Sequence, residues 1–339
     1  LTFINSYFES VSGLTTTGFT IFSNIKYYDP TLILWRSSSQ WIGGFFFLIF
    51  LVLIFSNFKN EYKLTHIVYN PDKTNNLYKD INSVVIKIFF IYLSLSAIIF
   101  ILLSLSGVRL FNGLNLAMTI SSTGGFLPTD ELKDIIKTNP QKIVLIFTLL
   151  ISVLNIYFFY SLFSKMGIRK KHQEDLMILT SILLFSLILL ISIDSAGLIE
   201  IVSSVISSIS TSGISIYEPP KNFNLFFVFL TIIGGSTLSN SSGLKFLRFY
   251  ILLKSSILEI VKLVTPNIII DQRILKTENK INTENINSSF LVFISFFISI
   301  LILSSFLSSG NLNFEKSFKL SILTLTNTVN SELQGLETI

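Results

Sequence analysis

The chain contains no cysteine, which excludes disulfide bonds and thiolate metal sites. Charged side chains are scarce as well: they make up 13% of the 339 residues, against roughly 25% in a typical soluble domain. A soluble domain of this length needs a polar surface that this composition cannot supply. Half of the residues are hydrophobic, and phenylalanine alone occurs 33 times, so we expect the protein to lie in lipid.

Catalytic signatures are missing too. The two histidines, His66 and His172, lie in polar stretches between apolar runs, and Asp194 has no evident carboxylate partner. The sequence has no Gly-x-Ser-x-Gly motif and no Walker or Rossmann fingerprint. We therefore predict that the chain is not an enzyme and holds no organic cofactor. We attribute its net charge of +5 to basic loops that orient membrane helices, not to nucleic-acid binding.

Long apolar runs indicate membrane-spanning helices, because crossing about 30 Å of hydrocarbon takes about 20 apolar residues in a helix. Six segments meet or approach this length: Leu32–Phe55, Val84–Leu105, Lys142–Phe163, Leu176–Ile193, Phe223–Val264 and Phe290–Leu307. The fifth segment is longer than one crossing requires, and it is interrupted by glycine and serine.

Four shorter apolar stretches accompany these segments, and each ends in a cluster rich in small polar residues and glycine or asparagine. The clusters are Thr15–Thr20, Ser121–Phe126, Ser210–Ser215 and Thr326–Ser331. Apolar stretches of this shorter length are often re-entrant instead of spanning. Because each interval between two clusters holds two long apolar segments, we predict four repeated units of helix, re-entrant helix, polar turn and helix.

The predicted fold is an all-α membrane protein in which four pseudo-repeated helix–pore loop–helix units surround one pore. Four units need eight outer helices, so we expect the helix that enters the first unit and the helix that leaves the fourth to be missing from this chain. Basic residues place the linkers in the cytoplasm and the polar clusters on the opposite side. The predicted boundaries are 1–56 for the first unit, 57–82 for a cytoplasmic linker, 83–166 for the second unit, 167–265 for the third unit with its broken exit helix, 266–288 for a second cytoplasmic linker and 289–339 for the fourth unit.

The polar clusters have the composition of a cation pathway. Irregular backbone at membrane depth is tolerated only where it is buried or lines a water-filled cavity, and rings of backbone carbonyls can replace the hydration shell of a cation. Serine and threonine add hydroxyl oxygens, glycine permits positive φ angles, and a short helix directs its negative end at the cluster. One such cluster alone would suit ordinary helix packing, whereas several at matching positions favour an ion pathway.

Several motifs resemble one known family. Glu9–Gly18 resembles the first pore loop of the Trk/Ktr/HKT superfamily of potassium transporters, nearest the TrkH type. The Gln-Trp-Ile-Gly-Gly sequence at Gln40–Gly44 resembles the start of that unit's exit helix. Ser121–Phe126 resembles the second loop, and Gly234–Arg248 resembles the broken exit helix of the third unit. The resemblance covers essentially the whole chain.

The resemblance implies a K⁺-selective pore with one filter position per unit and two preceding residues that supply carbonyls. The implied K⁺-binding residues are Thr16, Thr17, Gly18, Ser122, Thr123, Gly124, Thr211, Ser212, Gly213, Thr328, Val329 and Asn330. The fourth loop departs from the family pattern, because Asn330 stands where the family usually has glycine. Two alternatives to potassium uptake therefore stay open: a Na⁺-permeable or poorly selective transporter of the same fold, and a non-transporting fragment.

The resemblance also implies an intramembrane gating loop in the third unit, with a flexible kink or a close helix crossing as the alternative. The implied gate residues are Gly234, Gly235, Ser236, Ser241, Ser242, Gly243 and Lys245. Because an intramembrane cation is costly, Lys245 is expected to face a partner, a cavity or the inner interface. The family further implies a homodimer, a cytoplasmic nucleotide-binding regulatory subunit of the TrkA or KtrA kind, and a bacterial cytoplasmic membrane whose lipid surrounds the protein.

Two carboxylates lie within the predicted pore helices, Glu9 in the first unit and Glu200 in the third. Each would either extend to the outer vestibule as a solvated group or concentrate cations there. The sequence leaves both interpretations open.

Overall fold

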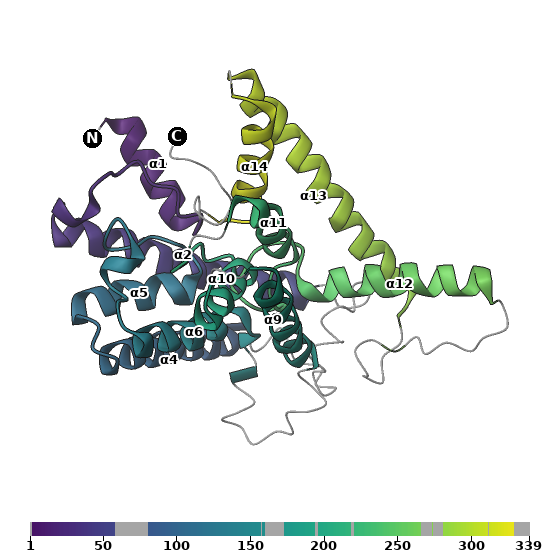
Figure 1. Cartoon of the computed structure of the whole chain (residues 1–339), viewed down its shortest axis with the longest axis horizontal. Coiled ribbons are helices and arrows are strands. Elements are labelled where there is room, and N and C mark those ends of the chain that lie inside the picture. The colour runs from purple at the N-terminus through teal and green to yellow at the C-terminus, as the bar shows by residue number, and fades with distance from the viewer. Residues whose placement is uncertain are drawn as a thin grey trace.

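The computed structural model of the chain describes residues 2–57, 81–156, 158–159, 173–193, 196–217, 220–265, 273, 281–310 and 312–328. This part of the chain is all-helical, as the sequence predicts. Figure 1 shows one group of packed helices, from which α12 extends to one side, while α13 and α14 stand together above it. The two predicted linkers and their basic residues lie mostly outside the described residues.

Four of the helices are short, with 12 or 13 residues each, and each ends in one of the polar clusters. They are α1 (Phe3–Leu14), α5 (Leu110–Ser122), α10 (Leu198–Ser210) and α14 (Phe314–Leu325). At about 1.5 Å per residue such a helix is only about 20 Å long, too short to cross the hydrocarbon core of a bilayer. The short apolar stretches of the sequence are therefore helices, as expected.

Longer or strongly apolar helices lie between the short ones. They are α2 (Pro30–Asn57), α4 (Ile81–Leu105), α6 (Asn139–Val153), α9 (Gln173–Ser192), α11 (Asn224–Ile233), α12 (Phe246–Val264) and α13 (Thr283–Ser309), with single 3₁₀ turns η1 (Ile25–Tyr27), η2 (Leu132–Asp134) and η3 (Lys221–Phe223). Within the described residues, three segments are long and apolar enough to cross a membrane: Val85–Leu105, Gln173–Ser192 and Thr283–Ser309.

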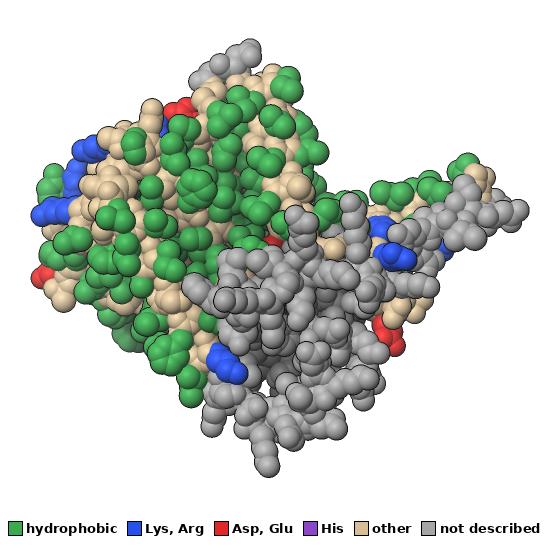
Figure 2. All heavy atoms as spheres, turned by 90° about the horizontal axis from the view of Figure 1, so that it is seen from below, with side chains coloured by type: hydrophobic (Ala, Val, Ile, Leu, Met, Phe, Trp, Pro, Cys, Tyr) green, Lys and Arg blue, Asp and Glu red, His purple; other side chains and the backbone are tan. Residues whose placement is uncertain are grey.

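The outer surface of these helices is apolar. On α13, for example, Phe290, Leu291, Leu301 and Phe306 are all exposed. Figure 2 shows hydrophobic side chains spread over the described face of the molecule, with Lys and Arg mostly near its margins. In water such a surface would be unfavourable, so it indicates contact with lipid.

The largest buried core lies among α4, α5, α6, α9, α10 and α11. Its members are aliphatic side chains with almost no exposed surface, such as Leu116, Leu149, Val205 and Leu230. The short helices α5 and α10 are thus held at the centre of the molecule by packing. A separate small cluster of Val228, Ile300 and Ile322 joins α11, α13 and α14.

Helix α6 ends earlier than the predicted span Lys142–Phe163. It ends at Val153, whose carbonyl oxygen accepts a hydrogen bond of 3.1 Å from the amide of Ser236. The amide of Ile156 then donates to the carbonyl of Leu238 over 3.0 Å. The helix stops here because the loop after α11 supplies backbone partners that would otherwise come from the helix itself, a contact that hydropathy does not reveal.

Two adjacent glycines bring α2 against the ends of two short helices. A Cβ atom added at Gly43 would lie 2.0 Å from the carbonyl oxygen of Leu14 at the end of α1, and one added at Gly44 would lie 2.7 Å from the Cβ atom of Ser122 at the end of α5. Real Cβ contacts are never this short, so only glycine fits at both positions. The Gly-Gly pair of the sequence motif therefore sets the distance between α2 and the polar turns.

We expect Gly43→Ala to destabilise the fold, because overpacking a tight contact costs about 1–3 kcal/mol. The melting temperature of the purified protein in detergent should fall. Gly113→Ala in α5 is the matched control, since the nearest atom would lie 3.7 Å from the new Cβ. A wild-type melting temperature for Gly43→Ala would contradict the close contact.

Candidate functional site

The same backbone turn follows each of the four short helices. In each turn a non-glycine residue adopts the left-handed conformation, which is uncommon for such residues. The residues and their φ angles are Thr16 (57°), Thr123 (56°), Thr211 (54°) and Asn327 (47°). This regularity shows that the four polar clusters share one local geometry.

Two hydrogen bonds define the turn. The left-handed residue donates its amide to the carbonyl three residues earlier, and the next residue donates to the carbonyl five residues earlier. The second bond joins Thr17 to Ser12 (3.0 Å), Gly124 to Thr119 (3.0 Å), Ser212 to Ser207 (3.3 Å) and Thr328 to Leu323 (2.9 Å). These bonds satisfy carbonyls at the helix end that would otherwise be left without partners in a buried site.

The geometry also aligns the turns with one another. Two residues after the left-handed residue lie Gly18, Gly125 and Gly213, whose φ angles are 85°, 82° and 66°. The sequence predicts Gly124 as the equivalent of Gly18 and Gly213. By the geometry of the turn the equivalent residue is Gly125, and Gly124 lies one residue before it. In the fourth turn the matching position is 329. Val329 and Asn330 lie outside the described residues.

The first, second and third turns lie in contact. A Cβ atom added at Gly18 would lie 2.3 Å from the carbonyl oxygen of Gly124, and one added at Gly125 would lie 2.9 Å from the carbonyl oxygen of Ser212. Glycine at these two positions therefore permits both the positive φ angles and the close approach of neighbouring turns.

The fourth turn contacts the third and the first. The hydroxyl of Thr328 donates to the carbonyl of Thr211 over 3.3 Å. The side chain of Asn327 donates to the carbonyl of Thr15 over 3.2 Å and accepts from the hydroxyl of Thr17 over 3.3 Å. The four turns thus contact one another in cyclic order and form a closed ring. The left-handed residues and the glycines of the ring are buried or half-buried, whereas Thr15 at its edge is exposed.

The loop between α11 and α12 lies against this ring. The side chain of Asn240 donates to the carbonyl of Ser121 over 2.7 Å, and the hydroxyl of Thr123 donates to the carbonyl of Asn240 over 3.2 Å. The amide of Ser242 donates to the hydroxyl of Thr211 over 2.8 Å. The loop is therefore bonded directly to the second and third turns.

Lys245 holds the loop in shape. Its buried ammonium group donates to the carbonyl oxygens of Ser236 (3.3 Å), Ser239 (3.0 Å) and Ser241. The sequence left open whether Lys245 faces a partner, a cavity or the inner interface. In the structure its partners are backbone carbonyls of its own loop. The neck of the loop is equally tight, since a Cβ atom added at Gly234 would lie 2.1 Å from the carbonyl oxygen of Ser242.

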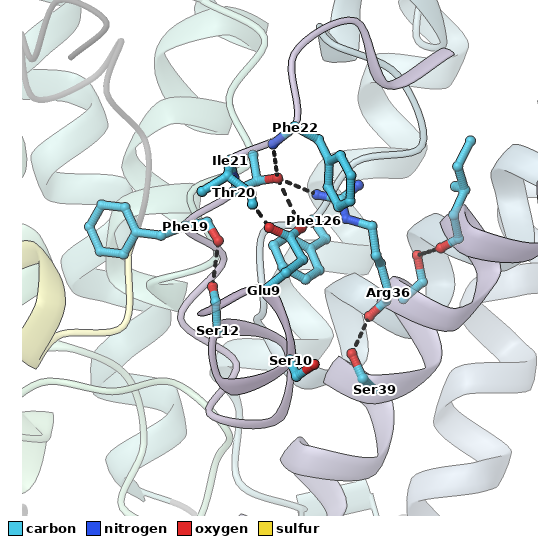
Figure 3. Close-up of polar contacts among 12 residues, drawn as sticks. Glu9, Ser10, Ser12, Phe19, Thr20, Ile21, Phe22, Arg36, Ser39 and Phe126 are labelled. Atoms are coloured by element: carbon cyan, nitrogen blue, oxygen red, sulfur yellow. Dashed lines mark hydrogen bonds and ion pairs between the residues drawn. The ribbon is translucent and has the colours of Figure 1, made fainter. Parts of the chain in front are cut away.

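Glu9 does not extend to a vestibule, and the structure corrects both interpretations of it. Figure 3 shows its carboxylate enclosed by the loop after α1 and by Arg36 of α2. The Glu9 and Arg36 side chains, each 2% exposed, are 2.7 Å apart, and the carboxylate also accepts from the hydroxyl of Thr20 (2.9 Å) and the amide of Ile21 (3.2 Å). The Arg36 guanidinium also lies 4.2 Å from the ring centre of Phe126. Glu9 therefore anchors the segment after the first turn to α2, and Arg36 extends this contact to Phe126 of the second turn.

Glu200 has a different partner. Its carboxylate accepts a hydrogen bond of 3.3 Å from Lys142 of α6, and it also accepts from the amide of Gly197 at the start of α10. The side chain is 32% exposed, so it caps a helix near the surface.

Gln40 is a residue of the site that the sequence did not predict, although it begins the Gln-Trp-Ile-Gly-Gly motif. Its buried amide bonds to the backbone of Gly124 and Phe126 in the second turn. The available signal was a glutamine three residues before a Gly-Gly pair within an apolar segment, because an amide in such a segment needs specific partners.

The comparisons with known proteins agree with this architecture. A family model described as TrkH, cation transport protein, matches residues 1–213. A solved structure of the potassium transporter TrkH from Vibrio parahaemolyticus superimposes with a TM-score of 0.81 and 17% identity, over 99% of this chain and 77% of that one. At this identity the likeness establishes the fold.

Two relatives illustrate the sequence similarity. An uncharacterized cation transporter of Methanocaldococcus jannaschii is 25% identical over 88% of this chain and 62% of its own length. The Trk system potassium uptake protein TrkH of Salmonella typhimurium is 26% identical over 90% of this chain and 65% of its own length. The chain thus spans less than two thirds of these relatives.

The fold is that of a multi-pass, all-helical membrane protein, and the family model places it in the class of cation transport proteins, which are not enzymes. The chain belongs to the TrkH family of cation transport proteins.

The buried pair of Glu9 and Arg36 gives a stability prediction. Removing one partner leaves an uncompensated buried charge, so Glu9→Gln and Arg36→Met should each cost about 3–5 kcal/mol. The double variant should lose less than the sum of the two, which a double-mutant cycle of unfolding free energies in detergent would measure. The matched control is the exposed pair of Glu259 and Lys262, whose coupling should be far smaller because solvent screens it. Additive effects at Glu9 and Arg36 would refute the pairing.

Proposed function

We propose that this chain forms the pore of a potassium uptake protein, with K⁺ bound at the ring of four turns. The observation that carries the proposal is the cyclic contact of the turns through Gly18, Gly125, Thr211 and Asn327. Four short helices end at this ring, so the negative ends of four helix dipoles converge on it. Relatives named as potassium uptake proteins support the choice of ion.

The proposed ion ligands are the backbone carbonyls and hydroxyls of the turns. The residues are Thr16, Thr17, Gly18, Ser122, Thr123, Gly124, Thr211, Ser212, Gly213, Thr328, Val329 and Asn330, and the turn geometry adds Gly125 and Asn327 to them. Carbonyl rings select cations by replacing their hydration shell. On this proposal the chain comprises four pore-loop units with the boundaries predicted from the sequence.

A poorly selective or Na⁺-permeable pore is the second candidate. It is favoured by the fourth turn, where position 329 is valine and position 330 is asparagine, while the other three turns have glycine at the matching position. Without glycine the fourth turn has less freedom to direct its carbonyl at the ion. Ion substitution separates the two candidates.

The loop of residues 234–245 is proposed as the gate. Its bonds from Asn240 and Ser242 to the second and third turns place it against the ring, and Lys245 keeps it folded. A loop in this position would obstruct an ion leaving the ring. Opening would require the bonds to the turns to break while the bonds of Lys245 keep the loop intact.

We further propose that the protein works as a homodimer in the bacterial cytoplasmic membrane, together with a nucleotide-binding regulatory subunit of the TrkA or KtrA kind. The support is family membership and the apolar outer surface, which suits lipid.

The proposed function is tested by growth of a bacterium that lacks its own potassium uptake systems. Expression of the native protein should restore growth at low K⁺. Gly18→Ala should abolish the rescue and lower Rb⁺ uptake at least about tenfold, because alanine is strained at positive φ and its Cβ would meet the carbonyl of Gly124.

Gly197→Ala is the matched control, since the nearest atom would lie 3.9 Å from the new Cβ and the residue lies outside the ring. It should rescue growth like the wild type. A well-expressed wild-type protein that fails to rescue would argue against potassium uptake, and equal uptake of Na⁺ and Rb⁺ would favour the second candidate.

The gate is tested by flux into reconstituted vesicles without any regulatory protein. Deleting residues 236–242 should raise K⁺ flux. Asn240→Ala is a milder change that removes the bond to Ser121, worth about 1 kcal/mol, and should raise flux about fivefold. Asn313→Ala, at an exposed helix start with no side-chain cap bond, should leave flux unchanged. If both gate variants conduct like the wild type, the loop is not a gate.

A further inference from the structure

Gln40 connects a long helix to the second turn through both ends of its side-chain amide. Its Nε2 atom donates to the carbonyl oxygen of Gly124 over 2.6 Å, and its Oε1 atom accepts from the amide of Phe126 over 3.1 Å. The side chain is fully buried on α2. The orientation of the amide is fixed by its partners, because Gly124 offers an acceptor and Phe126 a donor.

These two bonds lie on either side of Gly125. The carbonyl of Gly124 belongs to the peptide group before Gly125, and the amide of Phe126 belongs to the peptide group after it. Fixing both peptide planes fixes the φ and ψ angles of the residue between them. Gly125, with φ at 82°, is the residue that matches Gly18 and Gly213 in the other turns. Gln40 therefore holds the central residue of the second turn.

The contact also accounts for the glycine at position 124. A Cβ atom added there would lie 2.4 Å from Cδ, 2.5 Å from Oε1 and 2.8 Å from Nε2 of Gln40. The two adjacent glycines thus meet different requirements. Gly125 permits the backbone conformation, while Gly124 leaves space for the amide that stabilises it.

One face of α2 serves the first and second turns together. Arg36 and Gln40 are four residues apart, so they project from the same side of the helix. Arg36 is bonded to Glu9 of the first short helix and packs on Phe126, and Gln40 is bonded to the second turn. Movement of α2 would therefore be transmitted to both turns.

We propose that Gln40 is a positioning residue that sets the direction of the carbonyl oxygens in the second turn, and thereby the preference for K⁺ over Na⁺. The inference rests on the proposed function, in which these turns bind the ion. Gln40 acts through the backbone of Gly124 and Phe126 and does not itself bind the ion. Loss of its two bonds should change selectivity more than it changes the amount of folded protein.

The test is Gln40→Met in the native protein, reconstituted in vesicles, with the permeability ratio of K⁺ to Na⁺ as the readout. Methionine keeps the length and apolar packing of the side chain but removes both hydrogen bonds. Each hydrogen bond changes an equilibrium constant by a few-fold, so the loss of both should lower the permeability ratio about tenfold. Gln40→Asn is the second variant: it keeps the amide but withdraws it by one methylene, and it should also lower the ratio.

Gln141→Met is the matched control. Gln141 is also a buried glutamine with two backbone hydrogen bonds, to the amides of Lys137 and Thr138 at the start of α6, away from the ring. This variant should keep the wild-type ratio even if it is less stable. A wild-type ratio in both Gln40 variants would overturn the inference and leave the proposed function intact. A wild-type protein without K⁺ permeability would overturn the proposed function and the inference with it.

Discussion

The structure depends on how four short helices can end in the interior of the protein, where no water satisfies their last carbonyls. Each of α1, α5, α10 and α14 meets this constraint with a left-handed residue and two backbone hydrogen bonds. The bonds use some of the free carbonyls of the helix end and turn the chain sharply. The turn therefore allows a helix to stop in the buried interior and its polar end to meet three others.

The ring is supported unequally around its circumference. The first and second turns are attached to α2 by Arg36 and Gln40, and the second and third are attached to the loop after α11. The fourth turn is joined to its neighbours through Asn327 and Thr328. The four turns share one backbone conformation, yet each packs against different neighbours.

Charged groups near the ring of turns serve the architecture. Glu9, Arg36 and Lys245 are all buried. The pair of Glu9 and Arg36 joins α1 to α2, and Lys245 binds three carbonyls of the loop after α11. A buried charge is tolerated only with such partners, so each of these groups fixes the geometry of its neighbours. The proposed ion-binding atoms are then neutral carbonyls and hydroxyls, which suits a monovalent cation that must also leave.

Hydropathy and composition were enough to predict the class, the all-helical fold, and the approximate positions of the long helices, the short helices and the polar clusters. These follow from hydropathy and composition within about 20 residues, so neighbouring residues decide them. Only the tertiary structure aligned Gly125 with Gly18, ended α6 at Val153 and gave Glu9 its partner. Those features depend on contacts between residues far apart in the chain, such as Gln40 with Gly124 or Thr17 with Asn327. A local pattern cannot encode such a contact, because packing of whole helices brings the two residues together.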